Sequence, residues 1–162
     1  MEGKGECGRP IGAARRLRAV LPRTAHLRRR PPVVTRHEIV LGFPPSVNTY
    51  YRHVGPRVLI SREGRKYRMM TVSRLGGIKP LEGDLALTVH LYPPDRRRRD
   101  ADNCLKCLQD SLVHAGALRD DSQIKVLHVE MLEPVPDGRA YILLERKEEY
   151  DRRKQGLPPV AD

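Results

Sequence analysis

Apolar and polar residues alternate along two stretches of the chain, which is the pattern of β-strands with one buried face. In residues 83–94 the apolar positions are Leu85, Leu87, Val89 and Leu91. Residues 124–132 alternate in the same way. Residues 139–147 follow a Pro-Asp-Gly turn at 136–138, which predicts the closing strand of a hairpin.

Two shorter apolar runs near the start of this region also predict strands. Residues 37–43 end at Pro44–Pro45, which cannot continue a ladder. Residues 56–61 form the second run, which we expect to pair with the first or with a neighbour. Between them, the Pro-, Ser- and Asn-rich segment 44–53 predicts a loop.

Helical patterns occupy two further segments. Residues 62–75 are rich in helix formers, with Ser61 as a candidate N-cap and Gly76–Gly77 as a stop signal. Residues 101–116 carry apolar residues at steps of four and three, and Gly116 ends the pattern. The apolar stripe of this second helix is Ala101, Leu105, Leu108, Leu112 and Ala115.

The element order β-β-α-β-α-β-β predicts an α+β fold: a two-layer domain in which two helices cover one face of a mixed β-sheet. We place this domain at residues 37–150, with an N-terminal arm at 1–36 and a C-terminal tail at 151–162. No apolar run reaches the ~18 residues that a membrane span needs, so we expect no membrane association. An odd number of cysteines, three, argues against a disulfide framework and favours a reducing cytoplasm.

The chain carries a formal charge of +11, which suggests a polyanionic partner such as nucleic acid. Residues 1–36 hold 10 basic against 2 acidic residues, whereas residues 37–150 hold 18 against 16. Most of the excess charge therefore belongs to the arm, whose Arg- and Pro-rich composition predicts a flexible segment. The arm has two equal interpretations: it grips DNA, or it is an upstream extension without a role.

The segment 91–107 (LYPPDRRRRDADNCLKC) concentrates the candidate chemistry of the domain. Asp100 and Asp102 follow four consecutive arginines, Lys106 lies one helical turn after Asp102, and Asp120–Asp121 follow the same helix. If the strand that starts near residue 122 runs back beside the end of the strand at 94, the second acidic pair approaches the first. Clustered carboxylates repel one another unless a cation lies among them, and such hard oxygen ligands suit Mg²⁺, with Mn²⁺ as a substitute.

A metal held there would activate water and stabilise the charge that develops on a phosphodiester. The candidate ligands are Asp100, Asp102, Asp121 and Asp120, and Lys106 would place a positive charge on the same phosphate oxygens. The candidate contacts to the DNA backbone are Arg96, Arg97, Arg98 and Arg99. The pattern alone leaves a second interpretation open: helix-terminal acids, an ordinary Asp102–Lys106 pair and a solvated arginine loop.

Other chemical candidates in the domain are weaker. Cys104 and Cys107 form a C-x-x-C inside a predicted helix without a second pair for zinc, so we expect a structural role for them and rank a redox protein third. Tyr50 and Tyr51, with Arg52, lie in the predicted loop, where aromatic rings can stack on splayed bases or pack in the core. We slightly favour DNA contact.

Three blocks carry a resemblance to a known family: PPSVNTYYRH, PDRRRRDADNCLK and AGALRDDSQI. In this order and spacing they are similar to the signature blocks of the RusA family, the phage- and prophage-associated Holliday junction resolvases. The resemblance covers roughly residues 38–147 and leaves out the arm and the tail.

The resemblance implies a homodimeric, Mg²⁺-dependent crossover junction endodeoxyribonuclease that nicks two opposed strands of a four-way DNA junction in recombination and repair. It assigns catalysis to Asp100, Asp102, Lys106 and Asp121, with Asp121 the stronger metal ligand of its acidic pair. The alternative is a structure-selective DNA-binding protein of the same fold without catalysis, in which the acids only cap helices. A C₂ dimer is also expected from the two-fold symmetry of such a substrate.

Overall fold

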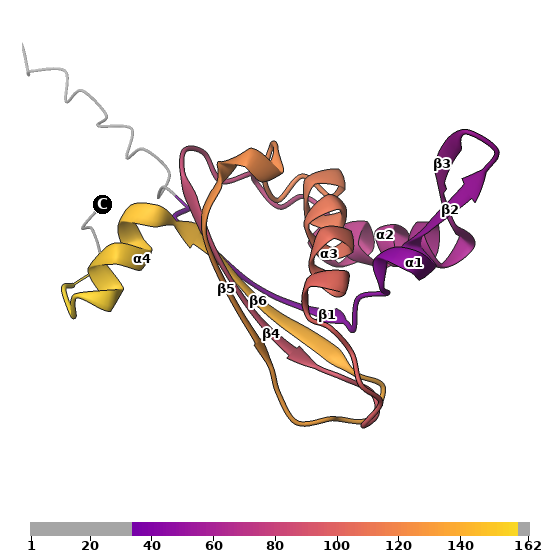
Figure 1. Cartoon of the computed structure of the whole chain (residues 1–162). Coiled ribbons are helices and arrows are strands. Elements are labelled where there is room, and N and C mark those ends of the chain that lie inside the picture. The colour runs from indigo at the N-terminus through magenta and orange to yellow at the C-terminus, as the bar shows by residue number, and fades with distance from the viewer. Residues whose placement is uncertain (1–33, 159–162) are drawn as a thin grey trace, which may run out of the picture. The chain divides into compact units, whose positions relative to one another are not determined.

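The central element of the domain is a four-stranded mixed sheet, seen in a computed structural model that describes residues 34–158 (Figure 1). Its strand order is β1-β6-β4-β5. The strands are β1 (Arg36–Gly42), β4 (Leu85–Tyr92), β5 (Ile124–Met131) and β6 (Arg139–Arg146). β6 is antiparallel to both β1 and β4, whereas β5 is parallel to β4. The predicted α+β class with a mixed sheet is confirmed.

The predicted hairpin of the last two strands is wrong, because β6 inserts between β1 and β4 instead of pairing with β5. β5 reaches its place through the crossover helix α3 (Asp102–His114), and such a crossover produces a parallel pair. Ile124 consequently pairs with Leu85 at the start of β4. The acidic pair before β5 therefore lies near the start of β4 and not beside its end, so the strand arrangement on which we based the approach of the two acidic pairs is not present.

The segment predicted as a loop is in part regular structure. It contains a short helix α1 (Val47–Tyr50), followed by β2 (Tyr51–Val54), which pairs antiparallel with β3 (Arg57–Ile60). These two strands form a separate hairpin, so the expectation of a single five-stranded sheet is wrong. Figure 1 shows this hairpin projecting beyond α2, on the side of the helices that faces away from the sheet.

Helices α2 (Arg62–Leu75) and α3 lie on one face of the sheet (Figure 1), as predicted. Ser61 caps α2 by accepting a hydrogen bond from the Gly64 amide at 3.0 Å. All four apolar side chains of the β4 pattern, at Leu85, Leu87, Val89 and Leu91, are buried beneath the helices together with Leu108 and Leu112. Each fully buried side chain of this size contributes ~1.5–3 kcal/mol, so this interface is the main source of stability.

The C-terminal part of the domain extends further than predicted. Helix α4 (Lys147–Lys154) crosses the boundary placed at residue 150, and Arg153 donates a hydrogen bond to the buried Glu145 of β6 at 2.6 Å. The predicted arm lies outside the described residues except for Val34–Arg36, of which Arg36 begins β1. No helix among the described residues is both long and apolar enough to cross a membrane.

Candidate active site

The arginine-rich loop after β4 is organised by one acid, Asp95. Its carboxylate accepts hydrogen bonds from the Arg99 guanidinium at 2.7 Å and from the Arg97 amide at 2.9 Å. These two donors, Arg99 foremost, lower the pKa of Asp95 to about 2. The Arg99 guanidinium also lies 5.6 Å from the centre of the Phe43 ring. Arg99 therefore holds the loop in place.

The other three arginines of the run are more accessible to a substrate, although Arg97 also lies 3.9 Å from Asp95. Arg96, Arg97 and Arg98 are exposed. The exposed fraction of the Arg97 side chain is 86%, against 22% for Arg99. All four arginines were candidate DNA contacts from the sequence, and the structure separates one anchoring guanidinium, that of Arg99, from three exposed cations.

Asp100 and Asp102 lie at the start of α3, and both are exposed. Asp102 accepts a hydrogen bond from the Asn103 amide at 2.8 Å, and Asp100 accepts one from the Asn103 side chain at 3.4 Å. Acids at a helix N-terminus are stabilised by the helix dipole. Because both carboxylates face solvent, they retain oxygen atoms that a cation can approach.

A cleft of about 620 Å³ opens beside Asp100. Its walls come from the segment 43–49, from α2 and from residues 94–104 around the end of β4. The charged and amide side chains that line it are Asn48, Glu63, Lys66, Arg98, Arg99, Asp100, Asn103 and Asp137. Basic and acidic groups therefore share one concave surface, which suits a phosphate backbone bound together with a cation.

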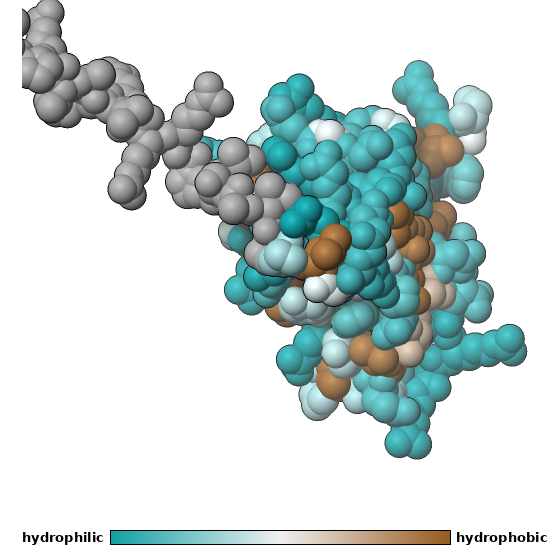
Figure 2. Space-filling model, turned by 90° about the vertical axis from the view of Figure 1, so that its left-hand side faces the viewer, coloured by the Kyte–Doolittle hydropathy of each residue, from teal (hydrophilic) through white to brown (hydrophobic). Residues whose placement is uncertain are grey.

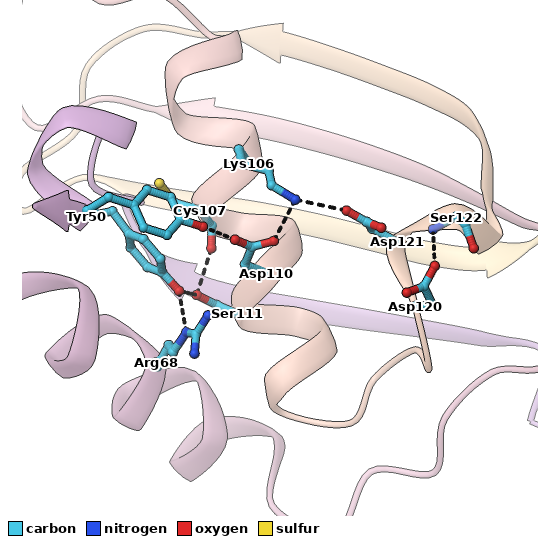
Figure 3. Close-up of polar contacts among 10 residues, drawn as sticks. Tyr50, Arg68, Lys106, Cys107, Asp110, Ser111, Asp120, Asp121 and Ser122 are labelled. Atoms are coloured by element: carbon cyan, nitrogen blue, oxygen red, sulfur yellow. Dashed lines mark hydrogen bonds and ion pairs between the residues drawn. The ribbon is translucent and has the colours of Figure 1, made fainter. Parts of the chain in front are cut away.

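Lys106 lies one turn into α3 and is held by two acids (Figure 3). Its ammonium donates to Asp110 at 2.9 Å and to Asp121 at 3.1 Å. These bonds, that to Asp110 first, raise the pKa of Lys106 above its ordinary value, so the side chain stays charged at neutral pH. Of the two possible i,i+4 partners, the structure pairs Lys106 with Asp110 and not with Asp102.

The two acids of the second pair have different roles. Asp120 caps a short 3₁₀ turn, η1 (Asp121–Gln123), by accepting from the Ser122 amide at 2.9 Å, which lowers its pKa. Asp121 instead turns toward α3 and meets Lys106 (Figure 3). η1 thus brings Asp121 to the helix even though β5 runs parallel to β4.

The tyrosines of the first block lie behind this network instead of on the surface. Tyr50 is fully buried, and its hydroxyl lies 3.2 Å from that of Ser111 and 2.5 Å from the Arg68 guanidinium (Figure 3). Tyr51 donates its hydroxyl proton to Asp110, and burial together with this bond raises its pKa. The expectation that Tyr50 stacks on bases is therefore wrong, since its ring belongs to the core. Arg52 remains exposed.

The predicted acids are not all gathered at one point. Among residues 34–158, Asp100, Asp102 and Asp121 do not bring three carboxylate oxygens within 4.8 Å of one another. Their chemistry nevertheless fits Mg²⁺, which is commonly held by one or two carboxylates together with substrate phosphates and water. Asp100 and Asp102 form the open acidic pair at the start of α3. Lys106, one turn further along α3, forms an ion pair with Asp121 of η1.

The two described cysteines have a structural role, although Cys104 also lines the cleft. Cys104 and Cys107 are buried on the core side of α3, and burial raises the pKa of both thiols, that of Cys107 to about 12. A thiol with so high a pKa is a poor nucleophile, which agrees with the structural role expected for this pair.

Sequence reasoning missed Asp110. It contacts Tyr51 with one carboxylate oxygen and Lys106 with the other, and only 18% of its side chain is exposed. The spacing of four residues from Lys106 was visible in the sequence as an i,i+4 pair. Nothing in the sequence indicated that a tyrosine from the first block would reach the same carboxylate.

Comparison with known proteins adds independent findings. The family model described as Endodeoxyribonuclease RusA matches residues 42–145. A crossover junction endodeoxyribonuclease of Enterobacteria phage HK97 is 40% identical over 109 residues, covering 65% of this chain and 91% of that protein. The protein of the same name from Escherichia coli K12 is 39% identical over 107 residues, covering 64% of this chain and 88% of its own. The matched region contains every residue of the cleft and of the Lys106 network.

Proposed function

The chain belongs to the RusA family of endodeoxyribonucleases, and from this membership we propose that it resolves four-way DNA junctions by hydrolysing phosphodiester bonds in two opposed strands. The observation that carries the proposal is the coexistence, on one helix and its preceding loop, of an open acidic pair, a doubly anchored lysine and three exposed arginines. Each of these groups meets a different requirement of phosphodiester hydrolysis.

Family membership implies a divalent metal, and we propose Mg²⁺, with Mn²⁺ as a substitute. Asp100 and Asp102 would hold it, with Asp121 the next candidate, because these acids offer hard oxygen atoms at the surface. When bound, the metal supplies an activated water and charge stabilisation. The proposal leaves Asp120 out of the ligand set, because its carboxylate is used as the cap of η1.

The protein's own groups position the substrate. Arg96, Arg97 and Arg98 contact the phosphate backbone, and of these Arg98 lines the cleft together with Lys66. Lys106 remains protonated, so it stabilises negative charge on the scissile phosphate and does not act as a base. Asp110 is a positioning residue: one of its carboxylate oxygens holds the Lys106 ammonium, and the other accepts the Tyr51 hydroxyl.

The test is cleavage of a synthetic four-way junction and of a duplex with matched sequence, each with and without Mg²⁺. We expect cleavage of the junction only, and only with the metal. Asp102→Asn should abolish cleavage while junction binding persists, because the amide keeps the volume but loses the charged oxygen.

Asp120→Asn is the matched control, since asparagine also caps well and this acid is not among the proposed ligands. It should cleave like the wild type. Cleavage by Asp102→Asn at the native rate would remove the metal site from the proposal. A wild-type protein that binds junctions but never cuts them would favour the non-catalytic alternative.

We also propose that the active form is a homodimer. Each chain offers one acidic pair, and a junction needs two opposed cuts, so a two-fold assembly matches the substrate. Exposed apolar side chains on the β2–β3 hairpin and on α2 offer a surface for contact between two copies of the chain: Val54, Val58, Leu59, Met69, Met70 and Val72. Light scattering at micromolar concentration and paired nicking of a cruciform plasmid test this. A monomer that makes both nicks in one binding event would contradict it.

A further inference from the structure

The face of the sheet opposite α3 carries a cluster that the proposed nuclease chemistry does not use. In β4 the leucines and Val89 point into the core, so the alternate residue His90 points to the other face. His90 pairs in register with Glu130 of β5, and His128 lies two residues before Glu130 on the same face. The strand register alone therefore gathers two imidazoles and a carboxylate.

The ligand atoms of this cluster are close enough for one ion. Nε2 of His128 lies 3.2 Å from one Glu130 oxygen, and Nε2 of His90 lies 3.7 Å from the other. One ligand atom from each of the three residues lies within 4.8 Å of the others. Zinc–ligand bonds of ~2.0–2.1 Å place the ligand atoms of a tetrahedral site about 3.3 Å apart. Small side-chain rotations close the remaining difference.

The surroundings favour a bound ion over a loose surface pair. The His90 ring stacks on the Tyr141 ring of β6, with 5.9 Å between centres and 27° between planes, which restricts its rotation. The exposed fractions of the His90, His128 and Glu130 side chains are 31%, 45% and 48%. The cluster is thus partly oriented by packing, yet open enough for an ion to enter with water in the remaining position.

We propose that His90, His128 and Glu130 bind a divalent transition ion such as Zn²⁺. Two imidazole nitrogens and one carboxylate oxygen are the ligands of a three-residue zinc site, whereas Mg²⁺ prefers oxygen ligands alone. Binding links the edge strand β5 to β4 and stabilises the fold. The site shares no residue with the carboxylates of α3 and does not depend on the proposed nuclease activity.

The test is calorimetric titration of the full chain with ZnCl₂ in excess Mg²⁺, which occupies hard oxygen sites and leaves nitrogen-containing sites free. Wild-type protein should bind one more Zn²⁺ per chain than His128→Gln. If the variant retains this site, its affinity for Zn²⁺ should be at least ~10–100-fold weaker than that of the wild type, because even an outer-shell change has that effect. Zn²⁺ should also raise the melting temperature of the wild type more than that of the variant.

His53→Gln is the matched control, since it removes an exposed imidazole from the separate β2–β3 hairpin. It should bind Zn²⁺ as the wild type does. Glu130→Gln serves as a second variant if His128→Gln folds poorly. Equal stoichiometry and affinity in wild type and both cluster variants would overturn the proposal, as would an equal loss in His53→Gln.

Discussion

Asp110→Asn tests whether the position of Lys106 matters for cleavage. The substitution keeps the size of the side chain but removes the charge that holds the Lys106 ammonium at 2.9 Å. Lys106 then retains only Asp121 as an anchor, at 3.1 Å. The ammonium remains paired with Asp121 but is free to move away from the position in which we propose that it meets the phosphate.

The expected effects follow from these contacts. Loss of the half-exposed Lys106–Asp110 pair costs ~0.5–1 kcal/mol of folding free energy. The Tyr51 hydroxyl then donates to a neutral amide oxygen instead of the Asp110 carboxylate, and this weaker hydrogen bond costs about 1 kcal/mol more of folding free energy. The protein should therefore stay folded. A displacement of the ammonium by about 1 Å lowers the cleavage rate by up to ~100-fold.

The assay is single-turnover cleavage of a four-way junction at saturating Mg²⁺, with junction affinity measured separately in the absence of metal. Asp110→Asn should lower the rate and leave the affinity nearly unchanged. Tyr51→Phe is the matched control: it removes the other bond of Asp110, so it should lower stability by a similar amount and leave the rate nearly unchanged.

Two results would refute this reasoning. Wild-type cleavage by Asp110→Asn, with the expected loss of stability, would show that Asp110 has a structural role only. An equal loss of rate in Tyr51→Phe would show that the effect arises from packing around α3 and not from the position of Lys106.

Three further predictions concern stability and DNA binding. The pKa of Asp95 falls from 3.8 in the unfolded chain to about 2 in the folded protein, so its bond to Arg99 stabilises the protein above pH 3.8, and that stability is lost as the pH falls through about 2. Acid unfolding of Asp95→Asn should lack this pH-dependent loss of stability, and identical acid unfolding profiles of variant and wild type would contradict the assignment. Gly64→Ala should destabilise the fold by ~1–3 kcal/mol in chemical denaturation, because an added Cβ would lie 2.6 Å from a backbone oxygen, whereas Gly42→Ala has open space and should be neutral. Deletion of residues 1–33 removes nine basic and two acidic residues, so the salt dependence of DNA binding should weaken while junction cleavage persists; loss of cleavage would make the arm part of the active unit.

Whether an element has a buried face decides how clearly its sequence predicts it, and Figure 2 shows one exposed face of the protein. That face is mostly hydrophilic, and its apolar side chains lie in separate patches (Figure 2). A buried face imposes a strict alternation in β4, and the sequence located β4 correctly for that reason. The exposed hairpin strand β2 has no buried face, so its sequence lacks the alternation of apolar and polar residues that predicts a strand.

The sequence by itself determined the family, the fold class and the groups available for chemistry. Local signals were sufficient for these: the cap at Ser61, the stop at Gly76, and the three blocks that resemble the RusA family. These features depend on residues that are near one another in the chain, where spacing translates directly into geometry.

Only the tertiary structure decided which groups meet. The parallel placement of β5 brings His128 and Glu130 beside His90, and η1 brings Asp121 to Lys106, across 15 residues of sequence. The tertiary structure also buries Tyr50 in the core, against Ser111 of α3. Strand order and register depend on the packing of whole elements against a shared core, and no local pattern encodes that long-range choice.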